Sequence, residues 1–158
     1  MSIVIMVKEL IICRGTPGSG KTTYAKEWAK CDSSNRIRLN LDDLRNMLGE
    51  YWVTKREPVV KAMLMAGLNE AAYCENPYHI IIDATNFNPK TIKEFEDWIQ
   101  TFNNSFFSKE NDVQYEMVYK DFPTPLEVCI ERDSKRERPI GEEVIRNMYN
   151  KYKDIIYK

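Results

Sequence analysis

The stretch GTPGSGKT, residues 15–22, determines how the rest of the chain is interpreted. Its spacing fits the pattern G-x-x-x-x-G-K-[ST] of a phosphate-binding loop, the Walker A motif. This motif needs a strand before it and a helix after it. The apolar, β-prone run LIIC at 10–13 predicts a buried strand, and TTYAKEWAK at 22–30 places apolar residues at helical spacing. The context therefore favours a phosphate-binding loop over a chance glycine turn that caps a helix.

The residue types in this loop suit the binding of a nucleoside triphosphate. Gly15, Gly18 and Gly20 carry no Cβ, so the backbone can turn tightly and approach an anion. Its exposed N–H groups form an anion-binding nest at a helix N-terminus. Lys21 is expected to reach the β- and γ-phosphates of ATP, and Thr22 to bind Mg²⁺ through its hydroxyl. The residues of this loop predicted to bind ATP are Gly15, Pro17, Gly18, Ser19, Gly20, Lys21, Thr22 and Thr23.

Strands and helices are predicted to alternate along the 158 residues, which are expected to form one domain, 1–158. Strands are predicted near 5–13, 36–40, 79–84 and 113–119, and helices near 20–30, 41–49, 55–75, 89–103, 124–135 and 140–154. The polar segment 101–112 predicts a surface loop that starts at the end of a helix. This alternation predicts an α/β fold with a central parallel sheet of four or five strands and helices on both faces.

Composition excludes several classes of function. The formal net charge of -1 excludes broad nucleic-acid electrostatics, so a nucleic-acid partner would be held at a local basic patch. The single histidine, His79, excludes a multi-histidine metal site. The four cysteines have no C-x-x-C spacing, which is typical of free thiols in a reducing cytoplasm. No apolar run is long enough to span a bilayer. We therefore expect a cytoplasmic protein without a membrane partner.

Because ligands bind at the carboxyl ends of parallel strands, the residues that follow each strand are the candidates for a site. After RIRLN at 36–40, Asp42 and Arg45 lie three positions apart and are expected to share a helix face. An aspartate in a first helical turn often only caps the helix. Beside a phosphate loop, however, a carboxylate is placed to act as a base on an incoming hydroxyl, and the arginine can hold an anionic substrate group.

The strand HIIID at 79–83 ends in Asp83, which resembles the acidic residue of a Walker B strand and is predicted to contact Mg²⁺. The loop after it offers Thr85 and Asn86 as hydrogen-bonding groups for the acceptor, although loop and cap chemistry alone is an open alternative. Asn88 is predicted to cap the next helix, with Pro89 in its first turn.

The charge run RDSKRERP at 132–139 places Arg132 and Arg136 at a spacing that predicts a shared helix face, with Arg138 at the helix end. A charge run is usually a solvated surface. Phosphoryl transfer, however, needs positive charge on the equatorial oxygens, and arginine supplies fixed bidentate donors for them. We therefore expect an arginine lid over the ATP phosphates.

Four segments occur in an order and at spacings that resemble the kinase domain of phage polynucleotide 5′-kinases: GTPGSGKTTYAKEW, LNLDDLRN, IIIDATNFNP and ERDSKRERPIGEEVIRNMY. The resemblance runs from Leu10 to Tyr149 and implies a P-loop kinase fold with an arginine lid. It also implies that Asp42 is the general base on the 5′-hydroxyl and that Arg45 contacts the phosphate of the acceptor's terminal nucleotide.

The same resemblance assigns the remaining roles. Lys21 and Thr22 would serve ATP and Mg²⁺, and Arg132, Arg136 and Arg138 would bind the ATP phosphates. The residues expected to be catalytic are Asp42, Lys21 and Arg136; those expected to bind the acceptor are Asp42, Arg45, Asp83, Thr85 and Asn86; those expected to bind metal are Thr22 and Asp83.

The resulting prediction is an ATP-dependent kinase for the 5′-hydroxyl end of DNA or RNA, in nucleic-acid end repair, with a functional link to a ligase that consumes 5′-phosphate ends. A phage gene would place it in the host cytoplasm. A P-loop kinase of a nucleoside, sugar or antibiotic is the alternative, mildly favoured by the pI of about 6.0. A nucleotide-binding switch is a third alternative, opposed by the Asp42 and Arg45 pair. No D-x-D motif occurs, so we expect no 3′-phosphatase activity.

Overall fold

Strand β1 (Met6–Arg14), which leads into the phosphate-binding loop, lies inside a four-stranded sheet with the order β2-β3-β1-β4. The other strands are β2 (Arg36–Asn40), β3 (His79–Asp83) and β4 (Val113–Asp121). Every pairing in the sheet is parallel. The computed structural model describes residues 3–156 of the chain. It confirms the predicted α/β fold with a parallel sheet of four strands.

The helices connect the strands and continue past the last one. They are α1 (Lys21–Cys31), α2 (Leu41–Met47), the 3₁₀ helix η1 (Thr54–Arg56), α3 (Glu57–Ala72), α4 (Pro89–Asn103), α5 (Phe106–Asn111), α6 (Leu126–Ser134) and α7 (Glu142–Ile156). As predicted, Asn88 caps α4 by accepting a hydrogen bond from the N–H of Lys90, and Pro89 occupies the first turn. Within residues 3–156, no helix has the length and apolar character needed to cross a bilayer.

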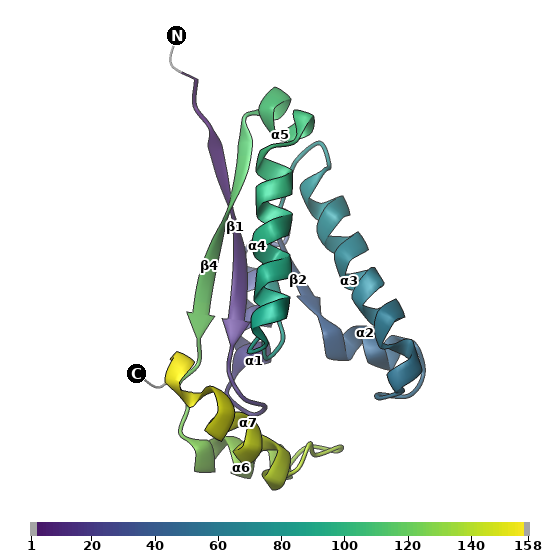
Figure 1. Cartoon of the computed structure of the whole chain (residues 1–158), viewed down its shortest axis with the longest axis vertical. Coiled ribbons are helices and arrows are strands. Elements are labelled where there is room, and N and C mark those ends of the chain that lie inside the picture. Colours follow the sequence, from purple (N-terminus) through teal and green to yellow (C-terminus); the bar gives the residue numbers. More distant parts are fainter. Residues whose placement is uncertain (1–2, 157–158) are drawn as a thin grey trace.

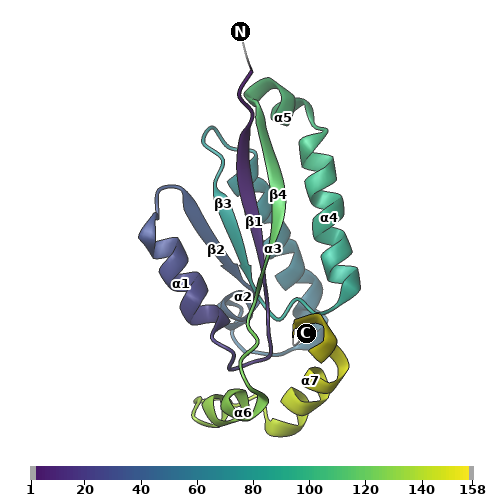
Figure 2. The same ribbon diagram turned by 90° about the vertical axis from the view of Figure 1, so that its left-hand side faces the viewer.

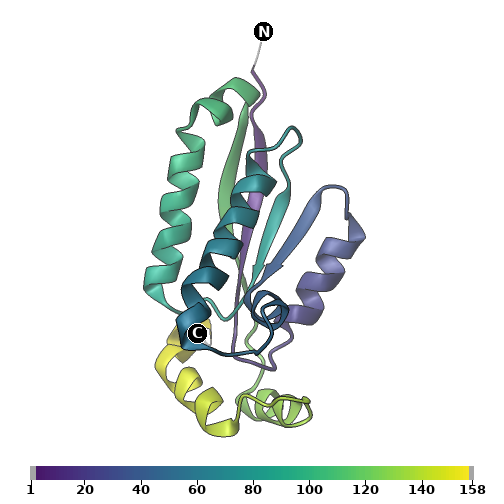
Figure 3. The same ribbon diagram turned by 90° about the vertical axis from the view of Figure 1, so that its right-hand side faces the viewer.

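The sheet has an apolar core on each face because successive side chains of a strand point to opposite sides. On β1, Leu10 and Ile12 join the larger cluster under α3 and α4, whereas Ile11 and Cys13 join a smaller cluster under α1. Figures 2 and 3 show α1 on one side of the sheet and α3 and α4 on the other. The near-continuous apolar strands are thus explained by burial on both faces.

The carboxyl ends of all four strands point to the same end of the molecule (Figure 1). The phosphate-binding loop, α2, α6 and α7 gather there, and α5 and the start of β1 lie at the opposite end. Open parallel sheets bind their ligands at this carboxyl end. The fold therefore brings together segments near residues 20, 42 and 135, which are far apart in the sequence.

The prediction of a surface loop over 101–112 was wrong. Helix α4 extends to Asn103, and α5 follows at Phe106–Asn111. Ser105 caps α5 by accepting a hydrogen bond from the N–H of Ser108, 3.1 Å away, and Phe107 packs against the larger core cluster. An N-cap and one half-buried aromatic ring are enough to form a helix in a segment whose composition is typical of a loop.

Candidate active site

The phosphate-binding loop connects β1 to α1 and takes its shape from left-handed glycines. Gly18 and Gly20 have φ of 81° and 101°, a backbone region that residues with a side chain rarely adopt. A Cβ on Gly18 would lie 2.4 Å from the carbonyl oxygen of Cys129 on α6. Glycine at position 18 is thus required both by the turn and by the close approach of the α6 backbone.

Lys21 is only 8% exposed, and its Nζ donates hydrogen bonds to the carbonyl oxygens of Gly15 and Thr16, each 2.8 Å away. Burial lowers the pKa of Lys21 from its ordinary value of 10.5 to about 8, and the nearby Asp83 carboxylate opposes that shift. Among residues 3–156, the Thr16 hydroxyl is a buried polar group with no hydrogen-bond partner. The loop therefore holds a buried cation and one unsatisfied hydroxyl, an arrangement that an anionic phosphate would complete.

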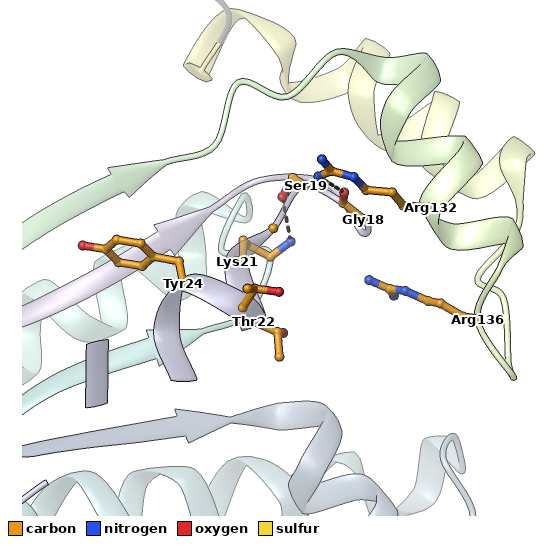
Figure 4. Close-up of a pocket in the computed structure, with 9 residues that line it drawn as sticks. Gly18, Ser19, Lys21, Thr22, Tyr24, Arg132 and Arg136 are labelled. Atoms are coloured by element: carbon orange, nitrogen blue, oxygen red, sulfur yellow. Dashed lines mark hydrogen bonds between the residues drawn. The ribbon is translucent and has the colours of Figure 1, made fainter. Parts of the chain in front are cut away.

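A cavity of about 490 Å³ lies over this loop, and we call it the donor cavity. Figure 4 shows Arg132 and Arg136 extending toward it from the α6 side, opposite Lys21 and Thr22. The guanidinium of Arg132 donates to the carbonyl oxygen of Gly18 across 3.3 Å. The lining residues are Gly18, Ser19, Gly20, Lys21, Thr22, Thr23, Tyr24, Arg132 and Arg136. Three cationic side chains thus surround a space bordered by the start of α1.

The predicted sharing of one helix face by Arg132 and Arg136 was wrong. Helix α6 ends at Ser134, so Arg136 lies in the following loop, and the arginines meet at the donor cavity because that loop folds back. The loop is held by Asp133, whose carboxylate is 1% exposed and accepts hydrogen bonds from the N–H groups of Ile140 and Gly141 at 3.1 and 2.9 Å. Residues 135–139 therefore form a short lid closed by one buried carboxylate.

A second cavity of about 470 Å³, the acceptor cavity, lies between the lid and α2. Its lining residues are Asp42, Asn46, Gly49, Tyr51, Arg136, Glu137, Arg138 and Ile140. Arg138, predicted to bind ATP, borders this cavity and does not line the donor cavity, because it lies beyond the turn of the lid. Arg136 borders both cavities. One guanidinium is therefore placed where a phosphate donor and its acceptor would meet.

Asp42 reaches the acceptor cavity from the first turn of α2. Its Oδ1 accepts hydrogen bonds from Nη1 of Arg45 at 2.7 Å and from the hydroxyl of Tyr51 at 3.1 Å. Asp42 and Arg45 thus share a helix face as predicted, and the structure adds a direct ion pair between them. Both of these hydrogen bonds use the same oxygen, so the second carboxylate oxygen of Asp42 is available to accept a proton.

Arg45 has a further partner that the sequence did not indicate. Its Nε and Nη2 form a bidentate pair with Glu57 at the start of α3, at 2.9 Å each. Burial would lower the pKa of Arg45, but the hydrogen bonds to Glu57 and Asp42 outweigh it and raise that pKa. Arg45 is therefore a fixed cation that orients Asp42, with part of its guanidinium still uncommitted.

Asp83, Thr85 and Asn86, which were predicted to bind the acceptor, line neither the donor cavity nor the acceptor cavity. Asp83 is 1% exposed, and its Oδ2 accepts hydrogen bonds from Arg38 at 2.9 Å and Asn40 at 3.0 Å. Asn86 is 6% exposed, has φ of 50°, and donates to the carbonyl oxygen of Cys13 at 2.7 Å. The carbonyl oxygen of Thr85 accepts a hydrogen bond from the N–H of Gly15. These contacts tie β3 to β1 and β2 at the start of the phosphate-binding loop.

Sequence reasoning missed Arg38, Tyr51, Glu57 and Asp133. Arg38 lies two positions before Asn40, so the alternation of strand β2 places both side chains on the Asp83 side, a signal that was available. Glu57 and Tyr51 follow Arg45 at no diagnostic spacing. Their role depends on how the segment between α2 and α3 folds, which no local pattern specifies.

The chain is similar to known proteins in both sequence and structure. The model of the AAA domain family (AAA_33) matches residues 10–155. An L-seryl-tRNA(Sec) kinase of Methanococcus maripaludis is 28% identical over 146 residues, covering 90% of this chain and 52% of that protein. A protein of Autographa californica nuclear polyhedrosis virus, named for polynucleotide kinase and RNA ligase activities, is 27% identical over 158 residues, covering 92% of this chain and 21% of that protein.

Among solved structures, one chain of the Pnkp1/Rnl/Hen1 RNA repair complex matches with a TM-score of 0.71 and 25% identity, over 96% of this chain and 46% of that chain. The chain thus spans about half or less of the length of these relatives. The family model, by contrast, covers most of the chain and includes the phosphate-binding loop, Asp42 and the lid. With its P-loop, its parallel sheet and this match, the chain belongs to the AAA domain family.

Proposed function

We propose that this chain is an ATP-dependent polynucleotide kinase that transfers the γ-phosphate to the 5′-hydroxyl end of DNA or RNA. One observation carries the proposal: Arg136 borders both the P-loop cavity and the cavity that contains Asp42. A nucleotide-binding switch needs only the first cavity. Phosphoryl transfer to an acceptor needs both, with a cation where the phosphoryl group passes between them.

The reaction follows from the groups around the two cavities. The acceptor hydroxyl oxygen attacks the γ-phosphorus of ATP, and the bond from that phosphorus to the β,γ-bridging oxygen breaks, so ADP leaves. The hydroxyl proton passes to the free carboxylate oxygen of Asp42. Lys21, Arg132 and Arg136 stabilise the negative charge that develops on the phosphoryl oxygens. The Tyr51 hydroxyl and Arg45 orient the base through its other oxygen.

The residues present fit a magnesium ion carried with ATP. The hydroxyl of Thr22 borders the donor cavity, whereas Asp83 is paired with Arg38. Within residues 3–156 there is no group of three or more His, Cys, Asp or Glu side chains that could hold a metal by themselves. Mg²⁺ is commonly bound through substrate phosphates with few protein ligands. Thr22 would bind the ion directly, and Asp83 would bind it through a water molecule. The ion would neutralise part of the phosphate charge.

The nature of the relatives supports an acceptor that is a nucleic acid. One is named a kinase of a seryl-tRNA, one is named for polynucleotide kinase and RNA ligase activities, and the third belongs to an RNA repair complex. We extend the proposal to nucleic-acid end repair, with a functional link to a ligase that uses the 5′-phosphate product. A small-metabolite kinase is the competing function, and an acceptor panel separates the two.

The test is transfer of labelled phosphate from ATP to a 5′-hydroxyl RNA, the matching DNA, a nucleoside 3′-monophosphate, a nucleoside, a sugar panel and water. We expect transfer to the polynucleotides, and at a lower rate to the nucleoside 3′-monophosphate. Asp42→Asn should lower transfer to every acceptor and leave ATP binding nearly unchanged, because the amide cannot accept the proton. Wild-type transfer confined to a sugar or a nucleoside would end the polynucleotide proposal.

A further inference from the structure

Trp52 is a large aromatic side chain that is exposed on the surface next to the candidate active site. It lies between α2 and η1 and is 54% exposed, whereas Trp98 in the core is 9% exposed. Its neighbour Tyr51 lines the acceptor cavity and donates to Asp42. Trp52 therefore directly follows, in the sequence, a residue that lines the cavity where the acceptor hydroxyl would bind.

The ring of Trp52 is held in place from one side. The guanidinium carbon of Arg45 lies 4.9 Å from the ring centroid, and Arg45 is itself fixed by its pairs with Asp42 and Glu57. The segment that carries the ring is also fixed, because Arg56 donates hydrogen bonds to the carbonyl oxygens of Leu48 and Glu50. A rigid aromatic face beside the base Asp42 loses little conformational entropy when a flat ligand stacks on it.

The charges around Trp52 favour a nucleic acid as that ligand. Arg45 lies against the ring, the side chain of Lys55 is exposed on the next helix, and Arg136 and Arg138 line the cavity beside Tyr51. An aromatic ring next to cations is the arrangement that binds single strands, since every base has a stacking face and every linkage carries a negative charge. In a duplex the bases are already stacked on one another, so an internal base has no free face to offer.

We propose that Trp52 stacks on one of the first two nucleobases of the acceptor, so that the chain selects single-stranded 5′-hydroxyl ends. This inference rests on the proposed polynucleotide kinase function and adds the strandedness of its substrate. The hydroxyl enters the acceptor cavity toward Asp42, the first linkage phosphate passes Arg45, and the base turns outward onto the indole ring.

The experiment compares Trp52→Ala and Trp52→Phe with wild type on three acceptors: a single-stranded oligonucleotide, the same strand with its first two nucleotides abasic, and a blunt duplex. Phe106→Ala is the matched control, because Phe106 is 79% exposed and lies on α5 at the opposite end of the molecule (Figure 1). Trp52→Ala should raise KM for the intact single strand on the order of tenfold, as expected for loss of one stacked base. Trp52→Phe should retain most of the wild-type value, because the ring remains.

On the abasic strand and the blunt duplex, wild type and Trp52→Ala should differ by less than about twofold, since the abasic strand has no base to stack and a paired base of the duplex cannot turn outward onto the ring. KM for ATP should stay unchanged in both variants, and Phe106→Ala should match wild type on every acceptor. Equal losses on intact and abasic strands, or no loss on either, would overturn the inference and leave the kinase function standing. If wild type phosphorylates no oligonucleotide at all, the proposed function fails and this inference fails with it.

Discussion

At the scale of single residues, Lys21 determines how the donor cavity responds to pH. Its pKa is lowered to about 8 by burial, so the free protein loses this charge as pH rises through that value. Because the ATP phosphates bind the charged form, the Kd for ATP should rise as pH passes the pKa of Lys21, by about tenfold per pH unit well above that pKa. Calorimetric titration of ATP over a pH series that brackets 8 measures this.

Lys21→Met is the control for that series. The variant should bind ATP weakly with little pH dependence, keep its fold by circular dichroism, and lose transfer by several orders of magnitude, as expected when a charged donor to the phosphates is removed. Near-normal turnover by Lys21→Met would mean that the loop does not hold the transferred phosphate.

Arg45 is predicted to have two roles, orienting Asp42 and contacting a phosphate of the acceptor, and one set of measurements separates them. Arg45→Ala removes a hydrogen-bond donor from Asp42, so kcat/KM should fall on every acceptor, including a bare nucleoside. On acceptors with a phosphate beyond the terminal sugar, an additional loss of about 1.5–3 kcal/mol is expected for one charged hydrogen bond. The measurement is kcat/KM for an oligonucleotide, a nucleoside 3′-monophosphate and a nucleoside.

Glu57→Gln is the matched variant for that comparison. It keeps a hydrogen-bonding side chain against Arg45 but removes the charge of the bidentate pair. It should reduce kcat/KM on all three acceptors, and by less than Arg45→Ala on the two that carry a phosphate, because the guanidinium is still present and Glu57 acts only through its position. Equal losses for Arg45→Ala on all three acceptors would show that Arg45 orients the base and contacts no phosphate.

At the scale of elements, the lid between α6 and α7 depends on Asp133. Asp133→Ala leaves the N–H groups of Ile140 and Gly141 without their acceptor, so Arg136 should no longer stay between the two cavities. We expect kcat to fall by at least about tenfold, since each lost hydrogen bond to a charged group is worth roughly 1.5–3 kcal/mol. Steady-state kinetics with ATP and an oligonucleotide, together with thermal unfolding, measures the effect.

Two further variants make this prediction specific. Asp133→Asn keeps one side-chain oxygen as an acceptor and should recover part of the lost kcat. Lys135→Ala removes a lid cation whose amine pairs with Glu131 on the exposed side of α6, so its kinetics should match wild type. Wild-type kcat in a stably folded Asp133→Ala would mean that the lid holds its position without this carboxylate.

At the scale of the whole molecule, the aromatic cluster around Phe102 and the candidate active site lie at opposite ends of the sheet (Figure 1). Phe102 is fully buried near the end of α4, with the rings of Tyr73 and Tyr115 each 4.9 Å away between centroids. Phe102→Ala should lower the free energy of unfolding by about 3–5 kcal/mol through lost burial and the cavity left behind. Urea unfolding measures this loss, and KM for ATP of the folded variant should stay unchanged.

Phe106→Ala on the neighbouring helix is the control, because its ring is exposed and its removal should cost less than about 0.5 kcal/mol. A large rise in KM for ATP in Phe102→Ala would contradict this separation, because it would mean that packing around α4 and α5 positions the phosphate-binding loop from across the sheet.

Three features could be predicted from the sequence alone: the phosphate-binding loop, the parallel sheet and the helix face that Asp42 and Arg45 share. Each depends on short-range rules: glycines where the backbone turns toward an anion, apolar runs that need burial on both faces, and a spacing of three on a helix. The N-cap at Asn88 was predictable for the same reason. In contrast, the helix α5 was missed, because its stability comes from packing of Phe107 against distant residues.

The partners of the charged groups, in contrast, depend on tertiary contacts that no local sequence pattern specifies. Arg136 borders two cavities because the lid folds back from the end of α6, and Asp83 contacts Arg38 because β2 and β3 pair in register. Glu57 meets Arg45 because α3 begins beside α2. Ion pairs depend on distances of a few ångströms between segments far apart in the chain, and sequence spacing specifies such distances only within one helix or strand.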